Sequence, residues 1–227
     1  MTVGLVFLTF AVMLTVQFLL HRYYHKEDVA VPTTARERRS DAPRVRPEIA
    51  AGFSIPGNLR YHPGHTWALN ESSELVRVGI DDFAAKFLGR SEKIQLPQRG
   101  QWIRQGQKVF GFVRDGKVVE LVSPIEGAVS AVNEAVARDP ELAHSDCYGD
   151  GWLLTVQAPD AKTMFRNLIG GSLVRHWMEE TAARLAALMP NSGAMALAQD
   201  GGTASHDIGR ELPDEKFGVA VREFFLS

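Results

Sequence analysis

The chain has 227 residues, with 25 Lys and Arg against 27 Asp and Glu, so its formal net charge at pH 7 is −2. This near balance excludes the strongly basic footprint of a dedicated nucleic-acid-binding protein. Cys147 is the single cysteine, so the chain alone can form neither an intrachain disulfide nor a multi-cysteine zinc or iron–sulfur site. Three zones of distinct composition predict one compact domain with an anchor and a tail.

The first segment is apolar enough to predict a membrane anchor. Residues 3–20, VGLVFLTFAVMLTVQFLL, contain no ionisable side chain and are close to the length of a transmembrane helix. A cleaved signal peptide normally has a basic start and small residues at its end, whereas Thr2 leads in here and the bulky HRYYHK follows. The positive-inside rule predicts a single-pass protein of the inner (cytoplasmic) membrane with its main domain in the cytoplasm, because the basic residues after the helix are Arg22, Lys26, Arg36, Arg38, Arg39, Arg44 and Arg46.

Residues 21–52 form a basic segment that contains prolines. Its later part, EDVAVPTTARERRSDAPRVRPEIAAG, has almost no large apolar side chains and cannot bury enough surface to fold alone. We therefore expect a linker. Its arginines could contact anionic lipid, or the segment could be a solvated spacer.

Residues 53–159 have the pattern of a small β domain. Between its second and third apolar runs, DDFAAKFLG predicts a short helix with Asp81 as its N-cap and Gly89 as its stop, and DPELAH predicts another helical turn. Short strands separated by Gly and Pro turns favour a mainly β sandwich or flattened barrel over a parallel α/β sheet. The apolar or alternating runs predict strands at 65–69, 74–80, 92–96, 108–113, 117–122, 127–132 and 152–158.

Three blocks of this domain resemble a known family. YHPGHTWALNESSELVRVGIDDFAAKFLG, VNEAVARDPELA and YGDGWLLTV, which lie between Tyr61 and Ala158, are similar to the H protein of the glycine cleavage system. The resemblance implies a flattened β-barrel, or barrel-sandwich hybrid, of the lipoyl-domain type with short helices. It also implies a carrier, because a lysine at the tip of a β-hairpin in that family, within a motif like E-S-V-K-A-A-S-D, holds lipoic acid that swings between partner enzymes.

The corresponding stretch here, GFVRDGKVVELVSP, aligns with that motif in two ways. A count without gaps places the family's acceptor on Gly116 and leaves Lys117 one residue late. A count with two compensating gaps keeps Lys117 as the acceptor. The glutamate three places before the family's lysine is missing in both alignments, being Val113 in the first and Arg114 in the second.

Turn chemistry favours the first alignment. Asp-Gly between two apolar runs is the strongest short-range signal for a two-residue type I′ hairpin. Asp115 and Gly116 would then form the turn that replaces the attachment tip, and Lys117 would be the first residue of the returning strand. We therefore expect no cofactor, and lipoate on Lys117 is the alternative, because one strand position is only about 3.4 Å from the tip.

The remaining candidates for chemistry are weak. His62 and His65 flank a proline ahead of a strand rather than sharing a helical face, so they do not predict a metal site. His144 lies near Cys147, but no base or orienting group can be assigned to make a nucleophile of the thiol. We expect neither a metal nor catalytic residues.

After Pro159 the periodicity becomes helical. Residues 160–189 predict two helices, the second with Ser172 as its cap, and we expect their apolar stripe to pack on the β domain rather than in a partner's groove. Residues 190–209 are small and polar and predict a flexible linker. Residues 210–227 predict a short amphipathic helix that docks on a partner or back onto this chain. The stripe includes Leu173, Trp177, Leu185 and Leu188, and the last helix carries Phe217, Val221 and Phe224 on one face.

Together these features predict a membrane-anchored H-protein-like module that is not an enzyme. We expect a non-lipoylated structural or interaction subunit of a cytoplasm-facing membrane assembly, with protein partners at the membrane and contact with the lipid bilayer through residues 3–20. The alternative is a lipoyl-bearing carrier, an aminomethyl or redox shuttle, that uses Lys117.

Overall fold

The structure, a computed structural model, describes Met13, residues 48–189, Ala204 and residues 206–226. By its internal contacts the chain divides into two units, Met1–Arg44 and Val45–Ser227. Everything described from Glu48 onward belongs to the second unit, which contains the predicted β domain.

The predicted transmembrane helix at 3–20 and most of the predicted linker at 21–52 lie outside the described residues. None of the helices that the structure describes is long and apolar enough to cross a bilayer. The anchor therefore stays a prediction from the sequence.

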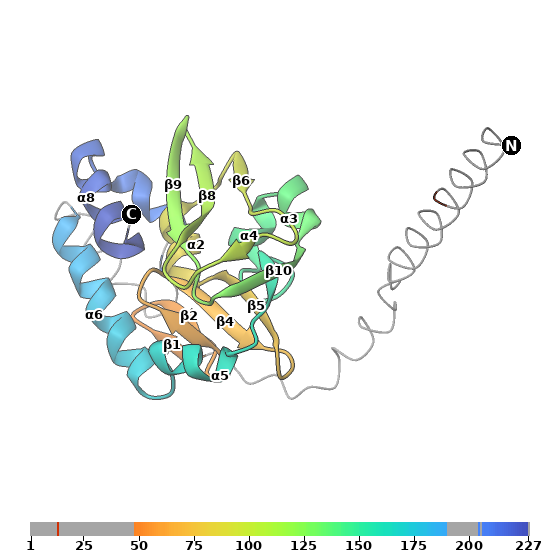
Figure 1. Ribbon diagram of the computed structural model, residues 1–227. Helices are drawn as coiled ribbons and strands as arrows, with labels where there is room; N and C mark the ends of the chain where they lie inside the picture. Colours follow the sequence, from red (N-terminus) through yellow and green to blue (C-terminus); the bar gives the residue numbers. More distant parts are fainter. Residues whose placement is uncertain (1–12, 14–47, 190–203, 205, 227) are drawn as a thin grey trace, which may run out of the picture. The chain divides into compact units, whose positions relative to one another are not determined.

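Three antiparallel sheets make up the β domain (Figure 1). The largest has the strand order β3-β4-β5-β11-β10-β7, the second β6-β8-β9, and β1 pairs with β2. The fold is mainly β with short helices, as the sequence predicts. The strands are β1 (Glu48–Ala50), β2 (Phe53–Ile55), β3 (Arg60–His62), β4 (Thr66–Asn70), β5 (Leu75–Ile80), β6 (Lys93–Gln95), β7 (Trp102–Ile103), β8 (Lys108–Arg114), β9 (Lys117–Val122), β10 (Gly127–Val132) and β11 (Leu154–Gln157).

Short helices lie among the strands in the sequence, and the longer helices α6 and α8 come after the last strand (Figure 1). The predicted caps of α2 are observed: an Asp81 side-chain oxygen accepts a hydrogen bond from the amide of Ala84, and Gly89 ends the helix at φ +60°. The helices are α2 (Asp82–Leu88), α3 (Glu134–Arg138), α4 (Glu141–Ser145), α5 (Ala161–Met164), α6 (Leu173–Leu188) and α8 (Asp214–Phe225), with 3-10 turns η3 (Phe165–Asn167) and η4 (Ile208–Glu211).

The seven predicted strands are all present, while β1, β2, β3 and β7 have two or three residues each and were not predicted. β1 begins inside the range 21–52 that we expected to be linker. Ala50 in β1 is only 1% exposed, because the strand pairs with β2 and packs on α6. The range predicted as linker therefore extends too far, because Glu48–Ala50 belong to the β domain.

Helix α6 packs on the β domain, as predicted, but its buried face differs from the predicted stripe. Leu173 is 67% exposed, because the buried positions are one residue out of phase with it: Val174, Met178, Thr181, Ala182 and Leu185. Ser172 occupies the N-cap position, as predicted, but its backbone angles are helical and its side chain makes no capping hydrogen bond.

Candidate functional site

The hairpin of β8 and β9 turns at Asp115 and Gly116. Their φ angles are +48° and +71°, and a type I′ turn requires positive φ at both central residues. The register therefore has the pairing that the Asp-Gly signal indicates, which is Arg114 with Lys117, Val113 with Val118, and Phe112 with Val119.

The apex of this hairpin carries no amine. The Asp115 side chain is 73% exposed, and a Cβ added to Gly116 would meet no atom within 4 Å. Lys117 lies one position into β9, where its Nζ is 3.0 Å from Oδ1 of Asp214 in the first turn of α8. The Lys117 side chain is 59% exposed, so its ammonium contacts both solvent and this carboxylate.

Arg114 connects the same end of the hairpin to two other elements. Its Nη1 donates a 2.7 Å hydrogen bond to the carbonyl of Leu88 at the end of α2, and it lies 2.5 Å from Oδ1 of Asp207, just before η4. The Arg114 side chain is 12% exposed, and removal of one partner from such a covered ion pair is costly. The flank of the hairpin is thus held against α2 and against residues 206–226, which we call the C-terminal segment.

A cleft of about 110 Å³ lies between the hairpin and the C-terminal segment. Pockets for small ligands usually have about 300–1,000 Å³ and are mostly apolar. This cleft is smaller and its rim is charged, so its geometry does not define a substrate pocket. The charged side chains that line it are Arg114, Asp115, Lys117, Arg210 and Asp214.

The C-terminal helix α8 docks on its own domain, which resolves the two alternatives that the sequence left open (Figure 1). Phe224 and Phe225 are 2% and 0% exposed. Phe224 packs edge-on against Phe83 of α2 at 5.1 Å between ring centroids, and Phe217 stacks on Phe87 at 5.5 Å. Aromatic burial of this size stabilises the docked helix far more than the ion pair at Lys117 does.

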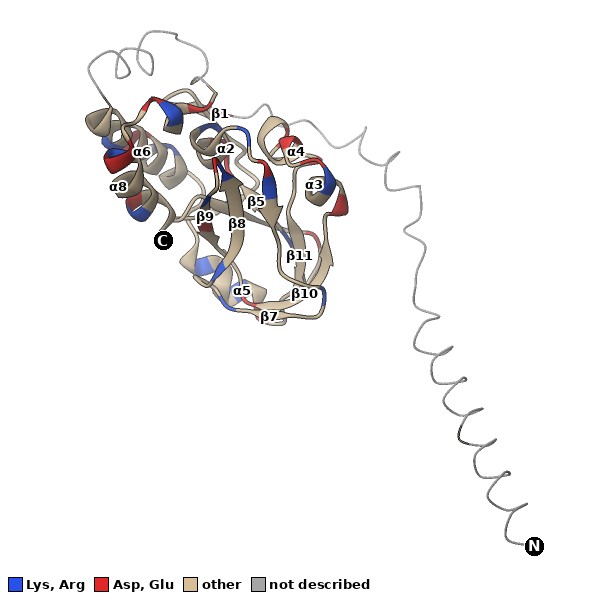
Figure 2. Cartoon of the chain, turned by 90° about the horizontal axis from the view of Figure 1, so that it is seen from above, with Lys and Arg blue, Asp and Glu red and all other residues tan. Residues whose placement is uncertain are grey.

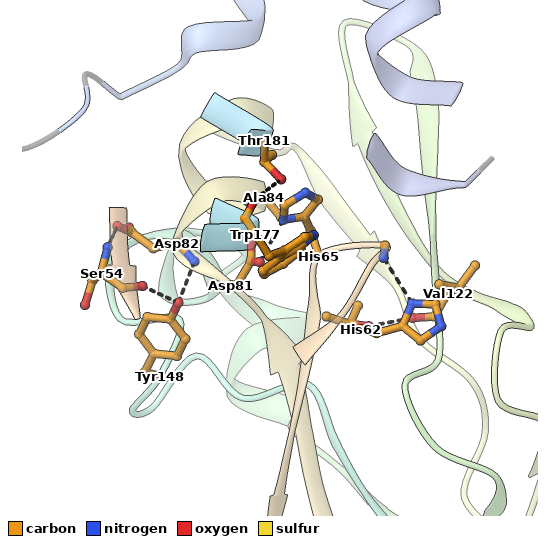
Figure 3. Close-up of polar contacts among 12 residues, drawn as sticks. Ser54, His62, His65, Asp81, Asp82, Ala84, Val122, Tyr148, Trp177 and Thr181 are labelled. Carbon is orange, nitrogen blue, oxygen red and sulfur yellow. Dashed lines mark hydrogen bonds and ion pairs between the residues drawn. The ribbon is translucent and has the colours of Figure 1, made fainter. Parts of the chain in front are cut away.

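His65 is part of the scaffold (Figure 3). Its Nδ1 lies 2.8 Å from Oδ2 of Asp81, and its ring is stacked between Phe83 at 4.1 Å and Trp177 at 4.8 Å. The side chain is 1% exposed. His65 therefore joins α6 to the start of α2 and is not presented to a ligand.

His62 is also held by the chain itself. Its Nδ1 accepts a hydrogen bond from the amide of Gly64 at 3.0 Å (Figure 3), and burial lowers its pKa to about 4, with a smaller contribution from His65. In the part of the chain that the structure describes, no three His, Cys, Asp or Glu side chains are grouped closely enough to hold a metal ion.

Cys147 and His144 have separate environments. Burial, reinforced by the Asp82 and Asp81 carboxylates, raises the pKa of the Cys147 thiol well above its usual value, which keeps the sulfur protonated and unreactive. Nε2 of His144 lies 3.1 Å from Oγ of Ser91, and burial lowers the His144 pKa to about 4.

Sequence patterns missed the two carboxylates that the structure brings to the hairpin. Asp207 falls in the range 190–209 that we expected to be linker, and Asp214 falls in the helix predicted within residues 210–227. Neither local spacing nor composition relates an aspartate to a lysine 97 positions away. The helical pattern in residues 210–227 was the one feature of the sequence that predicted ordered structure in the C-terminal segment.

The hairpin and the scaffold histidine belong to a region that matches a known family. The model of the glycine cleavage H-protein family matches residues 59–181, more than half of the chain. The chain belongs to this family. The match includes the hairpin, whereas η4 and α8 lie beyond its end.

Individual relatives match about half of this chain. The glycine cleavage system H protein of Mycobacterium avium (strain 104) is 42% identical over 111 residues, which are 48% of this chain and 83% of the relative. That of Anaeromyxobacter sp. (strain K) is 37% identical over 129 residues, 56% of this chain and 98% of the relative. A crystal structure of a glycine cleavage system H protein from Mycobacterium marinum is 33% identical, covers 46% of this chain and 86% of that one, and superposes with a TM-score of 0.43.

Proposed function

We propose that this protein is a non-catalytic H-protein-fold subunit that serves interaction rather than group transfer, anchored through residues 3–20 with its domain in the cytoplasm. One observation carries the proposal: Asp115 and Gly116 occupy the apex at which the family presents its acceptor lysine. A modifying enzyme needs an amine that stands out at a turn, and here the turn offers a carboxylate and a glycine.

The residues at the tip do not fit lipoate. The amine of Lys117 points to Asp214, and the adjoining cleft of about 110 Å³ is bounded by the C-terminal segment. We therefore assign no carrier step to this hairpin. An anchor supports the same conclusion, because a carrier must visit several enzymes, whereas a tethered domain suits one membrane-associated assembly of proteins.

The mass of the full chain, extracted from membranes of its own host, tests the proposal. We expect the unmodified mass, an unmodified peptide around Lys117, and stable protein partners that remain after detergent extraction. A lipoyl-sized adduct on Lys117 would overturn the non-lipoylated role, and a chain that leaves the membrane with a salt wash would overturn the anchor.

The second candidate is a lipoyl carrier that uses Lys117. Two observations favour it: the Lys117 side chain is 59% exposed, and the relatives at 37% and 42% identity are named glycine cleavage system H proteins. Treatment of the purified chain with a lipoate–protein ligase separates the candidates, with Lys117→Arg as the control. Wild-type labelling that Lys117→Arg abolishes would support the carrier.

A further inference from the structure

A second surface, far from the hairpin in the sequence, has a composition of its own. A groove of about 510 Å³ lies between β3, α5, η3 and the start of α6. Three cations line it, one from each of the first three elements: Arg60, Lys162 and Arg166. Phe165 and Leu173 add apolar surface to the same groove.

The charge of this groove is not neutralised by the other described residues of the domain. Within residues 48–189 and 206–226, neither Arg60 nor Lys162 nor Arg166 forms an ion pair, and no carboxylate lines the groove. Arg175, two residues after Leu173 in the first turn of α6, shows the contrast, since it pairs with Glu48 and Glu179. The groove therefore presents unpaired positive charge that suits an anionic ligand.

Leu173 adds the apolar part of the pattern. At 67% it is the most exposed large hydrophobic side chain among the described residues, and it stands at the first position of α6. An apolar side chain next to a group of cations is the combination that interfacial membrane-binding surfaces use, because the cations take headgroups while the apolar residue enters the boundary with the acyl chains.

The domain is connected to the rest of the chain at this same end. Glu48, the first residue of β1, is paired with Arg175, which lies two residues after Leu173 in α6, and β1 packs on α6 (Figure 1). The preceding sequence, residues 21–47, has seven Lys and Arg against four Asp and Glu, so it adds net positive charge, and it leads back to the predicted anchor. Its cations include Arg36, Arg38, Arg39, Arg44 and Arg46.

We propose that this groove is the membrane-facing surface of the domain and that it binds the headgroups of anionic phospholipids. Arg60, Lys162 and Arg166 hold the phosphate oxygens, and Leu173 enters the lipid interface. The inference rests on the proposed anchor, which keeps the groove within reach of one leaflet.

Hydrogen–deuterium exchange of the full chain in nanodiscs tests this surface. We compare phosphatidylcholine alone with phosphatidylcholine that contains phosphatidylglycerol. Anionic lipid should slow exchange over residues 160–175 severalfold, and Lys162→Glu with Arg166→Glu should abolish that difference. The matched control, Arg90→Glu with Lys93→Glu, makes the same change in net charge at exposed positions near β6 and should retain the protection.

Three results would overturn the proposal. If the chain co-elutes with the nanodiscs but its exchange is equal in both lipids, the groove does not bind anionic lipid, while the proposed anchor still stands. Inorganic phosphate that gives the same protection in neutral nanodiscs identifies a soluble phosphate ligand and not a membrane. If the wild-type chain does not co-elute with nanodiscs, both the proposed anchor and the proposed lipid-binding groove are contradicted.

Discussion

Lys117 and Asp214 lie 97 positions apart in the sequence, yet Nζ of the lysine is 3.0 Å from Oδ1 of the aspartate. The lysine belongs to the region that matches the H-protein family, and the aspartate to the C-terminal segment beyond it. An element outside the family's core thus contacts the side chain on which the carrier function would depend.

The ion pair itself should contribute little to stability. The two side chains are 59% and 91% exposed, and exposed pairs contribute about 0–1 kcal/mol. A double-mutant cycle with Lys117→Ala and Asp214→Ala, followed by urea denaturation, should give a coupling energy below about 1 kcal/mol that shrinks with added salt. A larger, salt-independent coupling would show that the pair helps to hold α8 in place.

Docking of α8 should depend on its aromatic residues instead. Phe225 is 0% exposed and packs edge-on against Phe87 at 5.4 Å. Because Phe→Ala in a core costs about 3–5 kcal/mol, Phe225→Ala should release α8 and speed amide exchange along 214–225. Val219→Ala, at a position that is 40% exposed, is the control and should leave exchange unchanged. Slow exchange in Phe225→Ala would mean that other contacts suffice.

Local signals predicted those elements whose causes are local. The strand alternation, the Asp81 cap and the Asp-Gly turn each depend on a few adjacent residues, and each appears where the sequence places it. β1 and β7 escaped because strands of two or three residues carry no periodicity and order only through their partners. The error at Leu173 has the same origin, because which face of α6 is buried depends on the surface beneath it.

The C-terminal segment shows why the environment of the candidate site could not be predicted. The amphipathic pattern identified α8 as a helix, but the surface that receives it is built by β9, α6 and the phenylalanines of α2, all of which are distant from it in the sequence. The charged faces of α6 and α8 point outward and carry both signs (Figure 2), so charge alone does not indicate where the helices dock.

The turn at the hairpin tip has room for a larger side chain at Gly116, but it should be destabilised by a residue that disfavours positive φ. A Cβ on Gly116 would meet no atom within 4 Å, so Gly116→Ala introduces only the strain of φ +71°. That strain should cost about 1–2 kcal/mol in the free energy of unfolding. Gly57→Ala is the matched control, since Gly57 also has open space around it but not a positive φ, and it should be neutral. Equal effects of the two changes would contradict a type I′ turn.

Stability should fall as the pH drops from about 6.5 to 4. Burial lowers the His144 pKa from 6.5 to about 4, so in this window the unfolded chain binds a proton that the folded chain does not. The stability is therefore fully present above pH 6.5 and is lost as the pH falls towards 4, by an amount on the order of 3 kcal/mol or less. In urea titrations, His144→Gln should reduce this slope and leave the dependence above pH 7 unchanged. An identical slope in the variant would mean that His144 is not responsible.

Moving the lysine to the apex should restore an acceptor. The count without gaps places the family's lysine on Gly116, and the structure puts Gly116 at the turn with open space around it. The double variant Gly116→Lys with Lys117→Ala moves the amine to the tip of the hairpin, away from the position that pairs with Asp214. A lipoate–protein ligase should therefore label this variant much faster than wild type. The single variant Lys117→Ala keeps the turn but has no amine there and should stay unlabelled. If wild type and the double variant are labelled at equal rates, the position of the turn does not control attachment, and the carrier role on Lys117 becomes the better account of this hairpin.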